Sequence, residues 1–337
     1  MQHDANGQLD VGVIGVGSMG QHHARVYDEL PGTTLVGVTD ADMDRAREIA
    51  DEYGTQAFSQ EELLSRVDAV SIVVPTRYHF DVLEEAIEAG AAPFVEKPVL
   101  GTLDQSEALT RLVDRTDLPV QVGHIERFNP AVTTLAQVID DLDVVSIRAQ
   151  RLGPPPERRI DDSAVMDLMI HDIDVVCSLL GESPREVHGA GVDGNRHASA
   201  LLSFDGGTMA TLIASRKTQR KVRTLEITAE DCFVVLDYID QSIEIHRNSA
   251  PEYVKDEGGV RFTHESIVER PTVTNAEPLR EELASFCQVV RDGGEPEVTV
   301  EDGLQALAVA QWIEESARGG SESSDYRPQP EVLTSDD

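Results

Sequence analysis

The stretch Val11-Gly12-Val13-Ile14-Gly15-Val16-Gly17-Ser18-Met19-Gly20 places an apolar, β-branched run directly before the pattern G-x-G-x-x-G. A second apolar run, residues 33–39, ends at Asp40, twenty residues after the last glycine of the pattern. This order predicts a strand, a tight turn, a helix and a second strand that ends on an acidic residue. Such a turn binds a dinucleotide pyrophosphate at the positive end of the helix, and the acidic residue binds a ribose hydroxyl.

The three glycines have separate tasks in this interpretation. Gly15 permits the tight turn, Gly17 lets the main chain approach the pyrophosphate, and Gly20 lets the helix pack closely on its strand. A glycine turn that binds no ligand is the alternative. The cofactor-binding residues predicted from this segment are Gly15, Gly17, Ser18, Met19, Gly20 and Asp40.

Asp40 favours NAD over NADP as the cofactor. Its carboxylate can accept a hydrogen bond from the ribose 2'-hydroxyl of NAD but would repel the 2'-phosphate of NADP. Ala41 follows at a position where NADP-binding proteins often carry an arginine. Arg45 and Arg47 lie farther along the next predicted helix, so NADP stays open as the less favoured cofactor.

Short apolar runs alternate with amphipathic stretches over the first 123 residues. The apolar runs predict strands buried on both faces of a sheet, at residues 11–14, 34–38, 69–74, 93–95 and 120–122. The amphipathic stretches predict helices at residues 41–53, 80–89 and 102–115. We therefore expect an α/β fold that begins with a Rossmann domain, a doubly wound parallel sheet, over residues 1–123.

The second half of the chain has a different pattern. Alternating apolar and polar residues predict strands at residues 144–152, 199–204, 207–214, 222–229 and 232–239. This predicts a second α/β domain on an open, mostly antiparallel sheet over residues 124–320, for substrate binding and oligomerisation. Late helices at residues 277–292 and 301–317 would pack back on the first domain. Residues 321–337 predict an acidic, disordered tail.

The charge balance is strongly acidic, with 62 acidic and 28 basic residues and a net charge of -34. The acidic residues are spread along the chain, and the only lysines are Lys97, Lys217, Lys221 and Lys255. Dispersed acids with arginine in place of lysine predict a halophilic protein whose surface stays hydrated in molar salt. Such a surface repels nucleic acid, so we expect no nucleic-acid partner.

Cysteine usage and hydropathy favour a soluble, cytoplasmic protein. Cys177, Cys232 and Cys287 are far apart and lack partners at ligand spacing, so neither a disulfide framework nor a metal site is expected. The N-terminus has no basic region followed by an apolar stretch, and no run of about eighteen apolar residues occurs. We therefore expect no membrane association.

Two further segments follow predicted strands of the first domain, at the sheet edge where ligands of open α/β folds bind. Residues 74–79 follow one strand and residues 96–98 the next. Pro75 could simply terminate its strand. Lys97 is informative because the chain carries so few lysines, and lysine can transfer a proton whereas arginine cannot. The predicted cofactor-binding residues here are Pro75, His79, Glu96 and Lys97.

The segment Asp167-x-x-x-His171 lies in a helix-like stretch over residues 164–180. Residues four apart share one face of a helix, so the two side chains can bind each other or one ligand. Apolar residues flank the pair on nearly every side, which predicts a buried polar constellation and an acid/base histidine. A surface ion pair is the alternative.

Together, Gly15-x-Gly17-x-Met19-Gly20-x-x-His23, Pro75-x-x-x-His79, Glu96-Lys97-Pro98 and Asp167-x-x-x-His171 resemble the glucose-fructose oxidoreductase / inositol dehydrogenase (Gfo/Idh/MocA) family over residues 9–320. The resemblance implies NAD(P)-dependent oxidation of a sugar or polyol hydroxyl, and homodimers or homotetramers formed through the C-terminal sheet. It also implies the catalytic residues: Lys97 as a proton-relay lysine, His171 as the acid/base histidine and Asp167 as its partner. Whether Lys97 or His171 takes the proton first stays open.

Residues 122–130 and 151–158 resemble the branch of this family that contains UDP-N-acetylglucosamine 3-dehydrogenases, which implies oxidation at C3 of the sugar. Five cations crowd residues 216–223 and would suit a nucleotide diphosphate, or alternatively an interface with an acidic neighbouring subunit. The predicted substrate-binding residues are Arg127, Asn129, Arg151, Arg158 and Arg216.

The favoured function is an NAD-dependent oxidoreductase that acts on C3 of a UDP-N-acetylhexosamine. Three alternatives stay open. The chain could be a dehydrogenase of free sugars or inositols, a redox-assisted glycosidase whose NAD is regenerated in every turnover, or a non-catalytic NAD-sensing protein.

Overall fold

The computed structural model describes residues 8–155, 162–248, 252–256, 259–263 and 265–318, which form two compact units. Unit 1 holds the described residues up to 128 together with 276–308, and unit 2 holds those from 129 to 275 together with 309–318. The domain boundaries expected from the sequence stay a prediction. Each unit is described by itself.

Unit 1 contains a six-stranded sheet with the order β3-β2-β1-β4-β5-β6, in which every pairing is parallel. Its strands are β1 (Leu9–Ile14), β2 (Thr33–Thr39), β3 (Gln56–Ala57), β4 (Ala69–Ile72), β5 (Ala92–Glu96) and β6 (Gln121–Gly123). The strand order reverses at β1, which lies between β2 and β4. Ligands of such folds bind at the carboxyl ends of the strands beside this switch point. The sheet confirms the predicted Rossmann fold.

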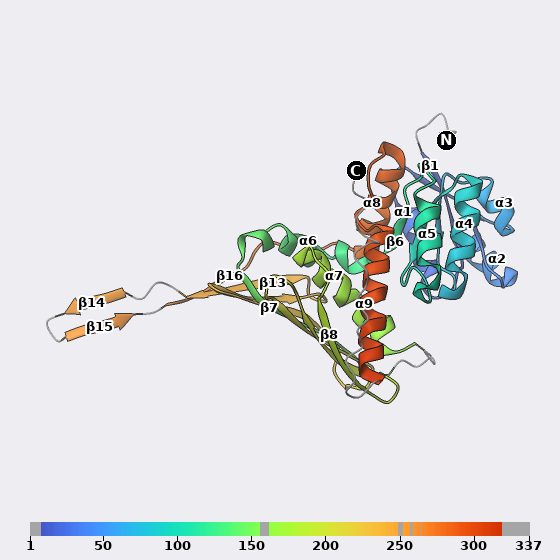
Figure 1. Cartoon of the computed structure of the whole chain (residues 1–337). Coiled ribbons are helices and arrows are strands. Elements are labelled where there is room, and N and C mark those ends of the chain that lie inside the picture. The colour runs from blue at the N-terminus through green and yellow to red at the C-terminus, as the bar shows by residue number, and fades with distance from the viewer. Residues whose placement is uncertain (1–7, 156–161, 249–251, 257–258, 264, 319–337) are drawn as a thin grey trace. The chain divides into compact units, whose positions relative to one another are not determined.

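Helices cover the sheet of unit 1, which explains why its strands are almost entirely apolar (Figure 1). They are α1 (Gly20–Glu29), α2 (Met43–Glu52), α3 (Gln60–Leu64), α4 (His79–Ala89), α5 (Ser106–Val113) and α8 (Pro278–Asp292). Helix α8 packs against α1, and the ring centres of its Phe286 and of Phe94 on β5 lie 5.7 Å apart in an edge-to-face arrangement. The core of unit 1 therefore includes a helix from late in the chain.

Unit 2 contains an eight-stranded sheet with the order β16-β13-β12-β11-β7-β10-β9-β8. Its strands are β7 (Val144–Leu152), β8 (Glu186–Val192), β9 (His197–Ser203), β10 (Met209–Ser215), β11 (Val222–Ala229), β12 (Cys232–Asp237), β13 (Ser242–Asn248) and β16 (Ser266–Glu269). Only the β7–β10 pairing of this sheet is parallel, which confirms the predicted, mostly antiparallel second sheet. Strands β14 (Glu252–Asp256) and β15 (Gly259–Thr263) form a separate antiparallel ribbon.

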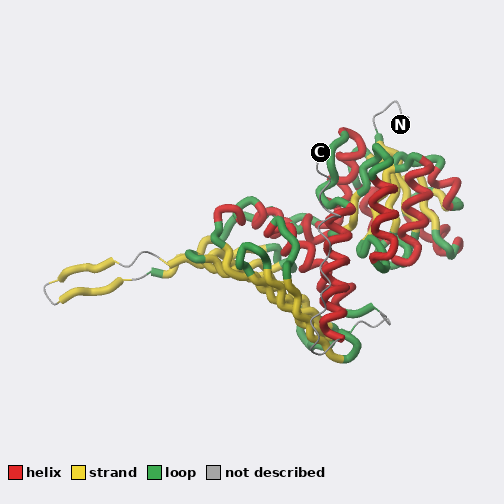
Figure 2. Tube along the Cα trace, viewed as in Figure 1, coloured by secondary structure: helices red, strands yellow, loops and turns green. Residues whose placement is uncertain are grey.

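In the described part of unit 2, helices pack on one face of the sheet and leave the other face uncovered. Helix α6 (Pro130–Ala136) contacts β12 and β13, and α7 (Ile170–Leu180) contacts β7 and β10 (Figure 2). Side chains alternate accordingly, because every second residue of β9 is buried and the residues between them are half-exposed. The last helix, α9 (Val300–Arg318), belongs to unit 1 up to residue 308 and to unit 2 from residue 309.

The helix expected over residues 164–180 differs from the structure at its start. Residues Val165–Met169 form a π-helical turn, closed by a hydrogen bond from the Ile170 amide to the Val165 carbonyl, and α7 follows. Such a turn holds one residue more than an α-helical turn. The apolar pattern continues through it unbroken, so hydrophobic periodicity could not reveal the change.

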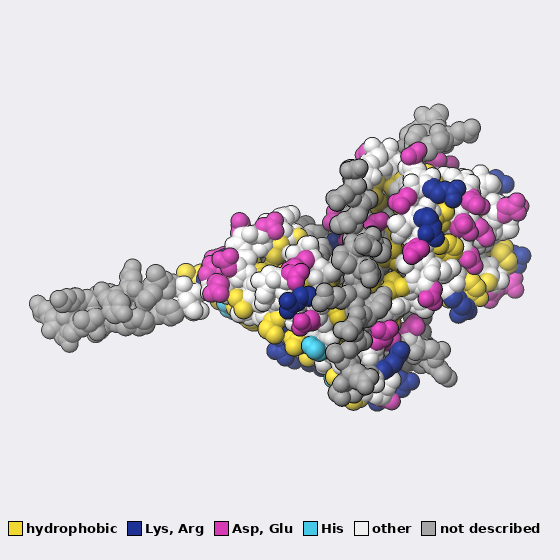
Figure 3. Space-filling model, in the orientation of Figure 1, with side chains coloured by type: hydrophobic (Ala, Val, Ile, Leu, Met, Phe, Trp, Pro, Cys, Tyr) yellow, Lys and Arg dark blue, Asp and Glu magenta, His cyan; other side chains and the backbone are white. Residues whose placement is uncertain are grey.

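Acidic side chains are distributed over the visible surface of both units (Figure 3). Among the described residues, no helix combines the length and apolar character that crossing a lipid bilayer requires. The three cysteines are buried.

Candidate functional site

The glycine turn of unit 1 can be built only with glycine at two positions. Gly15 has a φ of +90°, and a Cβ there would lie 2.6 Å from the carbonyl oxygen of Val73. A Cβ on Gly20 would collide with the carbonyl oxygen of Gly15. Gly17 is exposed and has no atom within 4 Å of the position its Cβ would take. The turn is therefore tight on its inner side and open on its outer side.

The open side of this turn fits a pyrophosphate. Helix α1 begins at Gly20 and has no acidic side chain in its first turn, so its positive end is not neutralised by its own residues. Ser18 is exposed and Met19 is half-buried on the same turn. Main-chain amides at the start of a helix suit phosphate oxygens, so these residues would hold the diphosphate of NAD.

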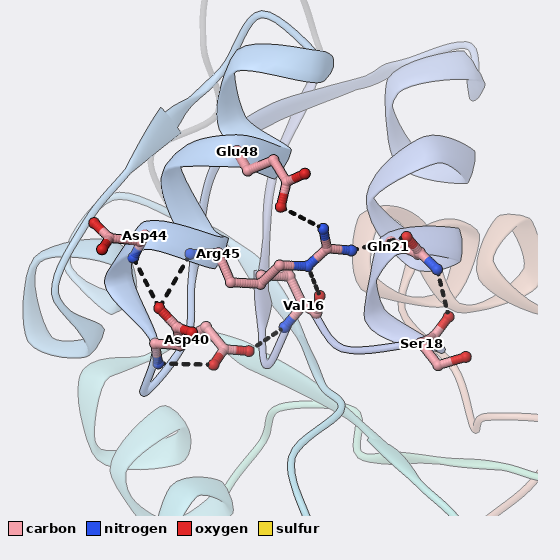
Figure 4. A network of polar contacts seen from close by, with 8 residues as sticks. Val16, Ser18, Gln21, Asp40, Asp44, Arg45 and Glu48 are labelled. Atoms are coloured by element: carbon pink, nitrogen blue, oxygen red, sulfur yellow. Dashed lines mark hydrogen bonds and ion pairs between the residues drawn. The ribbon is translucent and has the colours of Figure 1, made fainter. Parts of the chain in front are cut away.

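Asp40 at the end of β2 holds the glycine turn through the peptide of Val16 (Figure 4). Its Oδ2 accepts from the Val16 amide at 2.8 Å, and its Oδ1 accepts from the Asp42 amide at 2.9 Å. Arg45 reaches back from α2 and donates through Nε to the Val16 carbonyl at 3.2 Å. Each carboxylate oxygen has a second lone pair, so Asp40 can still accept from a ribose hydroxyl.

Arg45 and Arg47, the two arginines that could favour NADP, both donate hydrogen bonds to carboxylates. Arg45 Nη1 donates to Glu48 at 2.7 Å, and Arg47 Nη1 donates to Asp44 at 2.6 Å. Arg45 lies beside Asp40, whereas Arg47 is 63% exposed on α2. Of the two cations, Arg45 is the one placed near the predicted ribose site.

A series of buried hydrogen bonds connects α1 to the end of β5. His23 is fully buried, with Nδ1 3.0 Å from Ser71 Oγ and Nε2 3.1 Å from Glu96 Oε1. Tyr27 OH lies 2.8 Å from the same serine oxygen. Glu96 Oε2 in turn accepts from the main-chain amide of Lys97 at 3.2 Å. This series of hydrogen bonds thus reaches the main-chain amide of Lys97, the predicted catalytic lysine.

These hydrogen bonds favour the ionised form of the Glu96 carboxyl. Burial alone would raise its pKa, but the hydrogen bond with His23 and the charges of His23 and Lys97 outweigh burial. The pKa of Glu96 therefore lies below its ordinary value. A carboxylate at this position can orient the peptide that precedes the Lys97 side chain.

His79 joins the two segments that follow β4 and β5. Its Nε2 lies 2.9 Å from the Val74 carbonyl oxygen, and its Nδ1 lies 2.9 Å from the Pro98 carbonyl oxygen. Burial lowers the pKa of His79 even though both carbonyls favour the protonated ring. Pro75 is exposed directly beside this link, at the start of a 3-10 turn. His79 therefore fixes the segments on which Pro75 and Lys97 lie.

The predicted acid/base pair lies in unit 2. Asp167 is in the π-helical turn, and His171 is the second residue of α7. The Asp167 carboxylate accepts from Nη2 of Arg216, a contact that sequence spacing did not suggest. His171 is half-buried and its Nδ1 atom is buried. The partnership of Asp167 with His171 stays a prediction.

The residue after His171 makes a buried ion pair. Asp172 accepts from Arg151 Nε at 2.9 Å and from Arg151 Nη2 at 2.8 Å, and both side chains are 2% exposed. The guanidinium carbon of Arg151 lies 5.0 Å from the centre of the Tyr238 ring. This two-point contact fixes the first turn of α7 to β7. The structure thus directs Arg151, a predicted substrate ligand, into the protein interior.

Other predicted substrate ligands also have contacts within the protein. Arg127 Nη2 lies 3.3 Å from Asp302 Oδ1 in unit 1. Asn129 caps α6 in unit 2, because its Oδ1 accepts from the Ala131 amide at 3.1 Å. Its Nδ2 donates to the Tyr238 carbonyl at 3.0 Å. Arg158 lies outside the described residues.

Four of the five cations of residues 216–223 divide into paired and exposed members, and the fifth, Arg223, is half-buried on β11. Arg216 contacts Asp167, and Lys217 forms an ion pair with Asp193. Arg220 and Lys221 are exposed between β10 and β11. These two residues are therefore the best placed of the segment to meet an anion from solvent.

Sequence reasoning missed three contributors to these arrangements. His23 was part of a motif but had no assigned role, although its spacing from Gly20 on the first helix was visible. Asp172 stood beside the predicted histidine and was not singled out. Ser71 carried no signal, because a small polar residue inside a buried strand has many explanations.

Comparisons with known proteins identify the chain's relatives. Residues 9–124 match the family model described as an oxidoreductase family with an NAD-binding Rossmann fold, and residues 139–235 match the GFO/IDH/MocA C-terminal domain. The UDP-N-acetylglucosamine 3-dehydrogenase of Acidithiobacillus ferrooxidans is 37% identical over 247 residues, 72% of this chain and 78% of that protein. A crystal structure of that enzyme covers 92% of this chain and 97% of its own, with a TM-score of 0.82.

An inositol dehydrogenase is also similar over nearly the whole chain. The scyllo-inositol 2-dehydrogenase (NAD(+)) of Bacillus subtilis is 30% identical over 341 residues, 93% of this chain and 95% of that protein. Both relatives are named as dehydrogenases, and their names differ in substrate.

The contact between Asp40 and Val16 makes cofactor choice testable. Asp40→Asn keeps one acceptor oxygen but removes the charge that would repel a 2'-phosphate, and Arg45 is close by. We expect kcat/KM with NADP to rise about tenfold, roughly the effect of one charge-assisted contact, and kcat/KM with NAD to fall. Asp44→Asn, on the same helix start, is the control and should change neither value. An unaltered NAD-to-NADP ratio in Asp40→Asn would contradict the role of Asp40.

Proposed function

Because this chain belongs to the Gfo/Idh/MocA family of NAD-dependent oxidoreductases, which act on sugar or polyol hydroxyls, we propose that it oxidises the C3 hydroxyl of a UDP-N-acetylhexosamine. The observation that carries the proposal is the 37% identity with a UDP-N-acetylglucosamine 3-dehydrogenase. The relative of known crystal structure supports it, because its fold matches over nearly the whole chain.

The exposed cations Arg220 and Lys221 support a diphosphate-bearing substrate. They lie on the loop between β10 and β11 in a chain with a net charge of -34, where acidic side chains dominate the surface. A neutral sugar or inositol gives no reason for such a pair. Arginine and lysine both form charge-assisted hydrogen bonds with phosphate oxygens.

The proposed reaction removes a hydride from the carbinol carbon and a proton from its hydroxyl, which leaves a ketone. NAD, when bound, supplies the hydride acceptor. His171 accepts the hydroxyl proton, and we assign this to Nε2 because Nδ1 is buried. Asp167 orients the imidazole. Lys97, which directly follows β5, assists the proton transfer. Glu96 and His79 hold the peptides around Lys97 in place.

Oligomerisation through the open sheet face of unit 2 is part of the proposal. Large apolar side chains are exposed on its strands, with Met209 on β10 43% exposed and Phe233 on β12 38% exposed. Exposed apolar surface on a sheet face favours association with another copy. A homodimer or homotetramer would cover it.

A substrate panel tests the proposed function directly. We expect NADH formation with UDP-N-acetylglucosamine or UDP-N-acetylgalactosamine, with kcat/KM at least about tenfold above that for scyllo-inositol, myo-inositol or free glucose, since each lost phosphate contact is worth that much. The 30% identity with an inositol dehydrogenase makes inositols the strongest competitors.

The other outcomes of the panel each support a different function. A preference for an inositol would replace the proposed substrate. Hydrolysis of an aryl glycoside without net NADH would indicate a redox-assisted glycosidase. NAD binding without any turnover would indicate a non-catalytic protein.

The catalytic roles are tested by substitution of the two proton-transfer groups. Lys97→Met and His171→Ala should each lower kcat by roughly two to four orders of magnitude, because a positioned proton-transfer group is lost. Binding of NAD, followed by fluorescence titration, should persist in both variants. Asp167→Asn should do less damage, since the histidine remains. Arg111→Met and His188→Ala, which change exposed residues, are the controls. Near-normal turnover of Lys97→Met or His171→Ala would contradict the catalytic role of that residue.

The loop cations separate a diphosphate site from a subunit interface. Arg220→Ala and Lys221→Ala should raise KM for the UDP-sugar about tenfold and leave kcat nearly unchanged, because the diphosphate is bound alike in the ground and transition states. Arg185→Ala, an exposed arginine of the same unit, is the matched control. If the variants instead dissociate in size-exclusion chromatography with KM unaltered, the cations serve an interface.

A further inference from the structure

The side chain of Arg216 is directed into the protein, toward the segment that precedes α7. The residue directly follows β10 and is only 7% exposed. One guanidinium nitrogen donates to the carboxylate of Asp167, and another donates to the main-chain carbonyl of Asp162. Asp162 lies three residues before the π-helical turn, and Asp167 lies within it. Arg216 therefore connects the end of a sheet strand to the segment that carries Asp167 and His171.

The main chain of Arg216 rests on a well-defined support. Its amide donates to the Arg196 carbonyl at 2.9 Å, and the Asn195 carbonyl accepts from the Ala164 amide at 2.9 Å. The turn between β8 and β9 thus holds both Arg216 and the start of the π-helical segment. Asp193 and Asn195 have positive φ angles of 54° and 59° in this turn, which marks a tight hairpin turn.

The geometry of the π-helical turn determines where the side chains of Asp167 and His171 lie. It is anchored at its start, where Ser163 Oγ accepts from the Met166 amide at 3.1 Å. Asp167 lies in its middle, and His171 follows two residues after the turn ends. Single π-helical turns are frequently found at functional sites. An α-helical turn in its place would hold one residue fewer and would rotate the side chains that follow, including His171.

The other side of His171 is fixed independently. Asp172 is held by Arg151 on β7, with both side chains buried. Asp167 differs, because its side chain is 31% exposed and its contact is with Arg216. Of the two arginine–aspartate contacts beside His171, the Arg216 contact is therefore the one that reaches toward solvent.

We propose that Arg216 is a positioning residue for the dehydrogenation: by binding the Asp167 carboxylate and the Asp162 carbonyl, it fixes the π-helical turn and, through Asp167, the imidazole of His171. This inference rests on the proposed function, in which His171 takes the hydroxyl proton. It replaces a phosphate-binding role for Arg216 with a role inside the protein.

A kinetic comparison separates the two roles of Arg216. Arg216→Gln should lower kcat roughly 10- to 100-fold and leave the KM values for substrate and NAD within about threefold, since small displacements of a catalytic group cost this much. Arg216→Lys keeps one cation for Asp167 and should recover part of kcat. Arg185→Gln is the matched control and should behave like the unmodified protein. A raised substrate KM with unaltered kcat would overturn the proposal.

A double substitution tests whether Arg216 acts through Asp167. In the Asp167→Asn background, Arg216→Gln should lower kcat by less than about threefold further, because residues that act as a unit are not additive. Full multiplication of the two single effects would overturn the proposal.

A spectroscopic readout does not depend on the reaction. In protein labelled with ¹⁵N-histidine, the ring resonances of His171 are identified by their loss in His171→Ala. They should shift in Arg216→Gln and stay in place in Arg185→Gln. Unmoved resonances in Arg216→Gln would refute positioning even if the dehydrogenase activity is confirmed. Shifted resonances in a protein without dehydrogenase activity would support the contact while the proposed function fails.

Discussion

The close approach of α1 to the end of β1 is the constraint on which unit 1 depends. Because Gly20 carries no side chain, the helix can start against the carbonyl oxygen of Gly15, which any Cβ would strike. This start directs the positive end of the helix dipole at the open side of the turn. It also places His23, one turn later, within reach of Ser71 on β4 and Glu96 on β5. One steric requirement thus serves both the cofactor site and the support of Lys97.

Arginines act as internal connectors in unit 2 of this acidic chain. Arg151 lies on β7, and Arg216 directly follows the neighbouring strand β10. The two arginines bind aspartates on either side of His171 in the sequence. Burying such pairs costs desolvation free energy that offsets their attraction, so they add little to stability. Their planar guanidinium groups nevertheless fix direction, because they bind two acceptors at once. We therefore assign them to geometry at α7.

Much of the fold could be predicted from the sequence, because buried strands and amphipathic helices carry strong periodic signals. Strands β7 and β11 begin and end at the predicted residues. Strand β3 was missed because it has only two residues, and β16 because its side chains are all exposed. The π-helical turn was missed because the apolar pattern passes through it without interruption. Halophilic character, inferred from charge alone, stays a prediction.

The candidate site was harder to predict, because motifs give residue types and not partners. Asp40 and Glu96 stood at strand ends, so their place at the sheet edge followed from topology. Arg151 and Arg216 looked equally suited to a diphosphate, yet their acceptors lie 21 and 49 residues away along the chain. Pairing over such distances depends on the three-dimensional fold and leaves no local trace.

The most direct test of the account is the fate of the hydrogen on C3 of the sugar. UDP-N-acetylglucosamine carrying deuterium at C3 should yield NADH that contains one deuterium, detected by mass spectrometry, together with a 3-keto nucleotide sugar. Protein carrying His171→Ala should give neither product at an appreciable rate. Unlabelled NADH would place the oxidation at another carbon, and the absence of NADH would contradict a nucleotide-sugar dehydrogenase.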